Sequence, residues 1–258
     1  MIHAHLVLAD RIAEGRVEAW EALLPAPTRA PEGYAEVLSG QEVDRALRFH
    51  RRSDGVRYIQ RWFWLRCQLA HHLGVDPASL LFTVGRWGKP RLASPLRPRL
   101  EFNLSHSGAL VALAVSSSWP VGIDIEEVRP GAPVPEECLS PFELREVTSA
   151  GSPLERALRF ARIWTWHEAA LKAEGTGLAG QPPEWQPGQG RRHECLNQAA
   201  SAPRGLHVQS LPVREGWVGA IAVQFGKARL PCMNTAAPFA RGGCTHPDAE
   251  ARTSVTRR

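Results

Sequence analysis

Residues 121–126 read VGIDIE, a hexapeptide with the alternation of a half-buried β-strand. Successive side chains of a strand point to opposite faces, so Val121, Ile123 and Ile125 are predicted to face the core. Asp124 and Glu126 would then lie side by side on the other face. Neighbouring carboxylates raise each other's pKa unless a positive charge lies between them, and a hard cation such as Mg²⁺ takes oxygen ligands. The alternative is a half-exposed strand with a solvated acidic face.

Further strands and helices flank this hexapeptide on both sides. Residues 3–8 and 109–115 are predicted as strands, and LHVQSLPV and WVGAIAVQF near residue 220 predict a hairpin. Helical spacing covers residues 41–73 and 154–173. Gly74 is expected to end the first of these helices, and Ser140 to cap a short helix that begins at Pro141. This mixture of strands and helices predicts an α/β (α+β) protein.

Composition and charge describe a globular protein with a nearly neutral body. The 258 residues are 43% hydrophobic and carry a net charge of +5, but the stretch from Lys227 onward holds six basic and two acidic groups. The remaining body is too evenly charged to favour nucleic acid binding, in spite of a pI of 9.3. Residues 227–258 show no periodicity, so we expect a disordered tail there.

Cysteine use and hydrophobic runs indicate the compartment. The five cysteines are scattered, without a CxxC pair, which argues against a disulfide framework and against a structural zinc site. The first residues lack a cationic segment followed by a long apolar run, so no signal peptide is expected. No apolar run reaches the length of about 18 residues that a membrane span needs. We therefore expect a cytoplasmic protein without a membrane partner.

The stretch ARIWTWHEAALKAEG, residues 161–175, is the second segment that carries chemistry. Trp164, Glu168 and Lys172 recur every four residues and share one helix face. This face predicts a carboxylate for a metal ion and a lysine for a phosphate. The chain has 28 arginines but only three lysines, and a compact ammonium acts as a point charge on phosphate. The alternative is an ordinary surface Glu–Lys pair, which Trp164 on the same face disfavours.

Two shorter segments present polar side chains on predicted loops. Residues 102–108, FNLSHSG, are predicted as a polar loop after a short strand, with backbone N–H groups suited to an anion. His106 would contact phosphate or act in acid–base chemistry there, although a lone loop histidine is as often structural. Lys89 lies in WGKPRL, a turn that presents a cation.

Taken together and in this order, the motifs resemble those of the Sfp-type 4'-phosphopantetheinyl transferases. They are GKP at 88–90, FNLSHSG at 102–108, GIDIE at 122–126 and W-T-x-x-E-A-x-x-K-x-x-G-x-G-L at 164–178. The resemblance implies two similar α/β halves packed as a pseudo-dimer, with coenzyme A and Mg²⁺ in the cleft between them. It places the N-terminal half at residues 1–118 and the C-terminal half at 119–226.

The resemblance also implies an activity. The family transfers the 4'-phosphopantetheine group of coenzyme A to a serine of an apo acyl carrier protein or peptidyl carrier domain, and releases adenosine 3',5'-bisphosphate. The metal would be Mg²⁺ or Mn²⁺, and a monomer is expected because the pseudo-dimer already makes the cleft. The implied metal ligands are Asp124, Glu126 and Glu168, with Glu168 also the general base and Lys172 the catalytic lysine. The implied coenzyme-binding residues are Arg45, Arg48, Arg57, Gly88, Lys89, Pro90, Ser105, His106, Asp124 and Lys172.

One position departs from the family pattern W-x-x-K-E-A, because His167 stands where lysine is usual. The imidazole of histidine has a pKa of about 6.5 in model peptides. The sequence therefore predicts weaker coenzyme or carrier binding at high pH, or a different carrier preference. Three rival functions stay open. They are a non-catalytic homologue that binds coenzyme A or a carrier, a metal-dependent phosphodiesterase or nuclease, and a nucleic-acid-binding module suggested by the pI and an arginine-rich helix.

Overall fold

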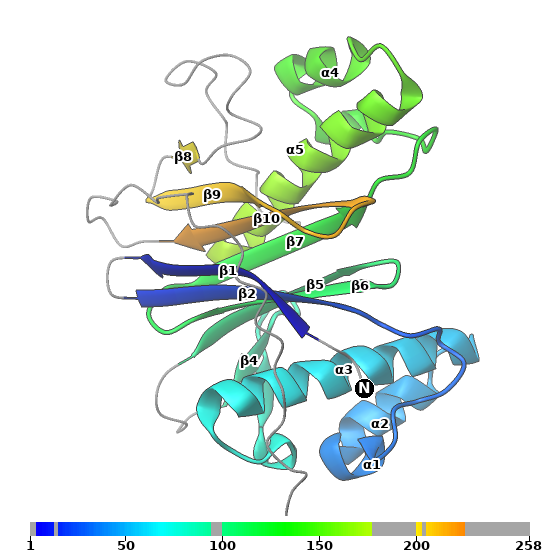
Figure 1. Ribbon diagram of the computed structural model, residues 1–258, viewed down its shortest axis with the longest axis vertical. Coiled ribbons are helices and arrows are strands. Elements are labelled where there is room, and N and C mark those ends of the chain that lie inside the picture. Colours follow the sequence, from blue (N-terminus) through cyan, green and yellow to red (C-terminus); the bar gives the residue numbers. More distant parts are fainter. Residues whose placement is uncertain (1–3, 13–14, 94–99, 177–199, 203–204, 225–258) are drawn as a thin grey trace, which may run out of the picture.

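The computed structural model of the protein describes residues 4–12, 15–93, 100–176, 200–202 and 205–224. Two antiparallel sheets lie against each other, and helices cover the outer face of each (Figure 1). Helix α3 packs on the first sheet and helix α5 on the second. The result is a four-layered molecule, helix–sheet–sheet–helix, which confirms the predicted mixed α/β class.

The first sheet has the strand order β1-β2-β6-β5, with antiparallel neighbours throughout. Its strands are β1 (Ala4–Ile12), β2 (Gly15–Leu23), β5 (Glu101–Ser107) and β6 (Leu110–Ser116). A small separate sheet pairs β3 (Phe82–Val84) with β4 (Pro90–Leu92). The sequence analysis missed β2, because Glu18 and Glu21 interrupt its apolar pattern although both are buried.

The second sheet has the order β7-β10-β9-β8. Its strands are β7 (Val121–Glu127), β8 (Ala200–Ala202), β9 (Leu206–Leu211) and β10 (Trp217–Gln224). The antiparallel register of β9 and β10 confirms the predicted hairpin. Among the described strands, β7 pairs with β10 alone, so its other edge has no backbone ladder to any of them.

Each half contains a short helix followed by a long one. The helices are α1 (Tyr34–Val37), α2 (Gly40–Leu47), α3 (Arg52–Leu73), α4 (Pro141–Thr148) and α5 (Pro153–Glu174), with 3-10 turns at Pro77–Ser79 and Glu136–Cys138. Ser140 caps α4, and Gly74 ends α3 in the left-handed conformation, both as predicted. Within the described ranges, no helix is long and apolar enough to cross a membrane.

The two halves repeat one arrangement. In order and pairing, β2, α2, α3, β5 and β6 correspond to β7, α4, α5, β9 and β10. The landmarks lie 101 positions apart: capping serines at 39 and 140, capping-box glutamates at 42 and 143, and C-cap glycines at 74 and 175. This repeat is the expected pseudo-dimer. Letter matching does not show it, because only a few landmark residues recur.

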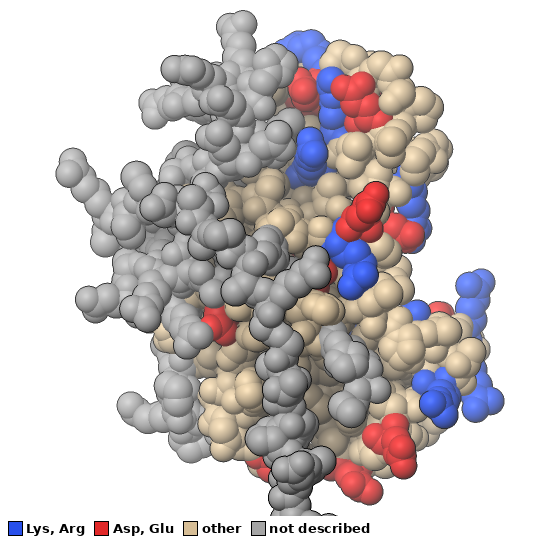
Figure 2. Space-filling view, viewed as in Figure 1, with Lys and Arg blue, Asp and Glu red and all other residues tan. Residues whose placement is uncertain are grey.

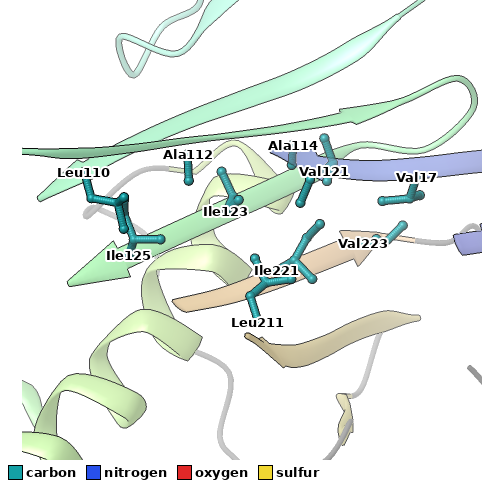
Figure 3. Close-up of a cluster of buried hydrophobic side chains, with 11 residues drawn as sticks. Val17, Leu110, Ala112, Ala114, Val121, Ile123, Ile125, Leu211, Ile221 and Val223 are labelled. Atoms are coloured by element: carbon teal, nitrogen blue, oxygen red, sulfur yellow. The ribbon is translucent and has the colours of Figure 1, made fainter. Parts of the chain in front are cut away.

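A hydrophobic core between the two sheets joins the halves (Figure 3). Val121, Ile123 and Ile125 on β7 are fully buried in it, which confirms the predicted alternation of the hexapeptide. The facing members of this core are Val17, Ala19, Leu110, Ala112 and Ala114 from the first sheet, and Leu211, Ile221 and Val223 join them from the second. The opposite face of β7 is therefore left for Asp124 and Glu126.

Gly122 allows α5 to lie directly on β7. A Cβ atom at this position would overlap the carbonyl oxygen of Ala169 and the backbone nitrogen of Ala173. We expect Gly122→Ala to push α5 away from β7 and to lower the free energy of unfolding by about 1–3 kcal/mol or more, the usual cost of overpacking. Urea unfolding measures the effect. Gly40→Ala is the matched control, because a Cβ there has open space; equal midpoints for the two variants would contradict the expectation.

Two predicted elements differ from the observed ones. The predicted helix over 41–73 is two helices, because the chain leaves helical geometry at Arg51, which is extended and caps α3. The predicted polar loop FNLSHSG is wrong, because residues 102–107 belong to β5 and only Gly108 lies in the turn that follows. Its asparagine and serines look loop-like in sequence, yet they alternate along a strand. The predicted tail at 227–258 lies outside the described residues.

Candidate functional site

Polar side chains of β5 take the place of a backbone ladder along the free edge of β7. The side-chain oxygens of Asn103, Ser105 and Ser107 accept hydrogen bonds from three alternate backbone N–H groups of β7, those of residues 123, 125 and 127. The nitrogen–oxygen distances are 2.9, 3.3 and 3.0 Å. We call this contact between β5 and β7 the seam. It joins the two halves, and it satisfies the edge N–H groups of a buried strand.

The same serines orient the acidic side chains of β7. Ser105 donates its hydroxyl to Oδ1 of Asp124 at 2.8 Å, and Ser107 donates to Oε2 of Glu126, also at 2.8 Å. Each serine therefore accepts from the β7 backbone and donates to a β7 carboxylate. The seam thus sets both the position of the strand and the direction of its two carboxylates.

Three carboxylates share this region. Asp124 is 3% exposed, while Glu126 and Glu168 are partly buried. Burial raises the pKa of all three, since it disfavours the charged form. Negative charge on Asp124 raises the pKa of Glu126 and of Glu168 further. A cluster of acids with raised pKa values is the environment that a cation would stabilise.

Lys172 is the cation that the structure places among these acids. Its Nζ lies 2.5 Å from Oδ1 of Asp124 and 4.0 Å from Oε2 of Glu168. The remaining oxygen of Asp124, Oδ2, is buried and has no hydrogen-bond partner among the residues that the structure describes. Across the described ranges, no three histidine, cysteine or acidic side chains converge closely enough to hold a metal ion in this arrangement. The orphaned Oδ2 and the three carboxylates nevertheless suit a hard divalent cation that would share the site with Lys172.

His106 lies beside a group of positive charges on α3. Although His106 is an exposed residue, desolvation by the surrounding protein lowers its pKa to about 4, and the charges of Arg61, Lys172 and Arg57 add to this effect. Burial also lowers the pKa of the guanidinium groups of Arg57 and Arg61. Burial disfavours the charged forms of these groups, and an anionic ligand would stabilise them.

Arg61 is a residue that the sequence analysis missed. It follows Arg57 by one helical turn, and its Nε donates to the Arg57 carbonyl at 3.1 Å. Arg57 itself donates to the carbonyl of Pro25 and to Gln60, which anchors it against the β2–α1 connection. The signal that could have found Arg61 is its four-residue spacing from Arg57 on one helix face.

Lys89 is bound to the backbone of the other half. Its Nζ donates to the carbonyls of Val121 and Lys172, at 2.9 and 2.7 Å. Burial lowers the pKa of Lys89 to about 8. Gly88 precedes it with a positive φ of 82°, and Pro90 begins β4. The structure therefore shows Lys89 bridging the end of α5 to β7, and its predicted contact with coenzyme A stays a prediction.

The remaining predicted residues are spread over α2 and α5. Arg45 is exposed and lies 5.6 Å above the ring of Tyr58, and Arg48 is an exposed cap residue. Among the described residues, neither belongs to the cations that act on His106. His167 is directed away from Lys172 and bonds to Glu143 on α4, at 2.8 Å. The predicted effect of His167 on coenzyme or carrier binding stays a prediction.

Comparisons with known proteins agree with the resemblance of the motifs. Residues 120–222 match the model of the 4'-phosphopantetheinyl transferase superfamily, and residues 27–118 match that of the 4'-phosphopantetheinyl transferase N-terminal region. The two matches cover both halves of the fold, including the seam and the carboxylates.

Individual relatives carry the same description. A 4'-phosphopantetheinyl transferase of Bacillus subtilis is 33% identical over 143 residues, which are 55% of this chain and 62% of the relative. HetI of Nostoc sp. is 36% identical over 166 residues, 63% of this chain and 70% of the relative. Sfp of Bacillus subtilis is 28% identical over 149 residues, 57% and 65% of the two chains. The matched region thus spans less than two thirds of two of these relatives.

Proposed function

Because the chain belongs to the 4'-phosphopantetheinyl transferase superfamily, we propose that it transfers the 4'-phosphopantetheine group of coenzyme A to a serine of an apo carrier protein. The carrier is an acyl carrier protein or a peptidyl carrier domain, and the second product is adenosine 3',5'-bisphosphate. The observation that carries this proposal is that an acidic group of side chains and a cationic group lie next to each other. Asp124, Glu126, Glu168 and Lys172 form an acidic site with one ammonium, and a cationic group around His106 adjoins it.

The cationic group suits the phosphates of coenzyme A. Arg57, Arg61 and His106 act on one another electrostatically, and Lys172 connects them to the acidic side chains. Phosphate binds such groups through charge-assisted hydrogen bonds. In this proposal, the cations for the phosphates come mainly from the first half, residues 1–118. The carboxylates come from the second half, residues 119–226.

The acidic group suits Mg²⁺ or Mn²⁺. Asp124, Glu126 and Glu168 would hold the ion, and the buried Oδ2 of Asp124 is an oxygen without another partner. When bound, the ion would supply positive charge where the pyrophosphate becomes more negative. Ser105 and Ser107 would keep two of these carboxylates in place through the hydrogen bonds of the seam.

The transfer step requires a base for the carrier serine, and Glu168 fits this role. In the step, the serine oxygen bonds to the phosphorus next to pantetheine, and the bond from that phosphorus to the bridging oxygen breaks. The bridging oxygen leaves with the electron pair as part of adenosine 3',5'-bisphosphate, and the serine proton passes to Glu168. Burial raises the pKa of Glu168, which makes this carboxylate a better proton acceptor. Lys172 would stabilise the charge of the leaving phosphate.

His106 provides a test of phosphate binding by pH. In the free protein its pKa of about 4 keeps the ring neutral at pH 6. A nearby phosphate would raise the pKa of His106, so coenzyme A should bind with proton uptake at about pH 6. Calorimetric titration in two buffers of different ionisation enthalpy measures this uptake. The variant His106→Asn should lose it, and equal heats for the wild type in both buffers would count against a phosphate at His106.

The activity is tested by the intact mass of an apo carrier protein after incubation with this protein, coenzyme A and Mg²⁺. The expected result is a gain of one phosphopantetheine on the carrier serine, which a chelator abolishes and fresh Mg²⁺ restores. A carrier of unchanged mass across several unrelated carriers, with coenzyme A bound, would favour the rival of a non-catalytic homologue. Hydrolysis of coenzyme A without any acceptor would favour the phosphodiesterase rival.

The nucleic acid rival has less support. On the face shown in Figure 2, the described acidic and basic side chains are interspersed and form no continuous basic area. Arg57 and Arg61 of α3 act electrostatically on His106, and a coenzyme phosphate bound there would account for these two cations. A monomer that works in the cytoplasm stays part of the proposal, as the sequence predicts.

A further inference from the structure

In the first half, a buried arginine holds the capping glutamate of the short helix. Glu42 accepts the backbone N–H of Ser39 in the capping box of α2. Arg66 on α3 donates to both oxygens of the same carboxylate, at 2.9 and 3.1 Å, and is 2% exposed. Arg66 therefore ties the beginning of α2 to the middle of α3.

The second half contains the equivalent interaction, with a histidine in place of the arginine. Glu143 accepts the backbone N–H of Ser140 at 2.8 Å in the capping box of α4. Nε2 of His167 on α5 lies 2.8 Å from the other oxygen of that carboxylate, and the His167 side chain is 5% exposed. An ionised carboxylate only accepts hydrogen bonds, so His167 is the donor.

The two interactions occupy equivalent positions of the repeat. Glu42 and Glu143 are the third residues of their helices, and positions 66 and 167 are 101 apart, the same offset as the capping serines and the C-cap glycines. Residue 167 thus corresponds to a residue whose role is plainly to hold a helix. Its neighbour Glu168 lies on an adjacent face of α5, directed towards Lys172.

We infer that His167 is a positioning residue, which holds α4 through Glu143 and thereby fixes the orientation of α5 that places Glu168 beside Lys172. The side chain at position 167 then serves the capping glutamate of α4, and no contact with coenzyme A is required of it. The expectation from sequence of an effect on coenzyme or carrier binding stays a separate prediction. The effect on turnover rests on the proposed transfer activity, whereas the effect on folding does not.

The experiment compares His167→Ala, Glu143→Ala, their double variant and His167→Arg in the full chain. Urea unfolding, calorimetric titration with coenzyme A, and carrier modification are measured for each. We expect both single alanine variants to lower the equilibrium constant for folding about tenfold, as for a hydrogen bond to a charged group, with the double variant little worse than either. Turnover should fall by at least about tenfold, because small displacements of a reacting group have large effects, while coenzyme affinity stays within about twofold.

The arginine variant and one further control sharpen the result. His167→Arg should retain the folding and turnover of the wild type, because Arg66 already makes this contact in the first half. Glu155→Ala removes an exposed carboxylate from the first turn of α5 that bonds to Gly151 and Arg159, and should leave turnover unchanged. This variant controls for the loss of a carboxylate near the beginning of a helix, independent of the contact with position 167.

Two outcomes would overturn the inference. One is a loss of coenzyme affinity in His167→Ala that Glu143→Ala does not share, which would show a direct ligand contact. The other is additive effects of the two alanine substitutions on unfolding, which would show that the pair does not act together. A wild type that modifies no carrier would refute the proposed function instead, and the unfolding cycle would still decide whether the pair holds α4.

Discussion

Glu168→Gln is expected to lower the turnover of carrier modification by about 10²–10⁴-fold, the usual contribution of a general base. The amide keeps the size of the side chain but cannot accept the serine proton. Burial and the neighbouring acids raise the pKa of Glu168. A raised pKa suits a general base and is not expected of an ordinary surface Glu–Lys pair. Single-turnover kinetics at saturating coenzyme A and Mg²⁺ measure the chemical step directly.

The matched control for this prediction lies on the same helix. Glu155→Gln makes the same chemical change near the beginning of α5, where the side chain is solvent-exposed and its oxygen can still accept from Gly151. Its turnover should equal that of the wild type. A Glu168→Gln variant that retains more than about a tenth of the wild-type rate would mean that another group takes the proton, since a base contributes at least about a hundredfold.

Arg66→Met is expected to lower the free energy of unfolding by about 3–5 kcal/mol, the effect of breaking a buried ion pair by removing one partner. Glu42 would stay buried with an uncompensated charge. The carbonyls of Pro77 and Leu80, which also accept from Arg66, would lose their donor. Urea unfolding followed by tryptophan fluorescence measures the loss.

The double variant Arg66→Met with Glu42→Leu separates charge from packing. Replacing both members of a buried pair by apolar residues is often nearly neutral, so the double variant should be more stable than Arg66→Met alone. If the single variant loses less than about 1 kcal/mol, as an exposed pair would, Arg66 does not hold α2 in the way described.

The strands and helices with one clear period could be predicted from the sequence. Strand β7 alternates apolar and acidic residues, and α5 carries a long helical pattern with a glycine at its end, so both were predicted close to their observed bounds. Strand β5 could not be recognised, because its inward-facing positions hold Asn103, Ser105 and Ser107 in place of apolar side chains. Their partners are the backbone and carboxylates of β7, which no local pattern reveals.

The candidate site was predictable in its composition and less so in its contacts. The motifs indicated Asp124, Glu168 and Lys172 together, and the structure places Lys172 against both acids. The contacts of Lys89 and His167 were not predictable, because each bonds to a partner that the repeat brings close from a distant part of the chain. Only the three-dimensional equivalence with Arg66 gives His167 a role.

The seam also breaks the twofold similarity of the two halves, because the described strands form it once. By the repeat, the partner of the β5–β7 contact would join β9 to β2. In the described structure both of those edges are already occupied, β9 by β8 and β2 by β1. Strands β1 and β8 thus occupy the edges that a second contact of this kind would use. Among the described strands, the repeat therefore forms this seam once, because the edges that a second seam would need are paired with β8 and β1.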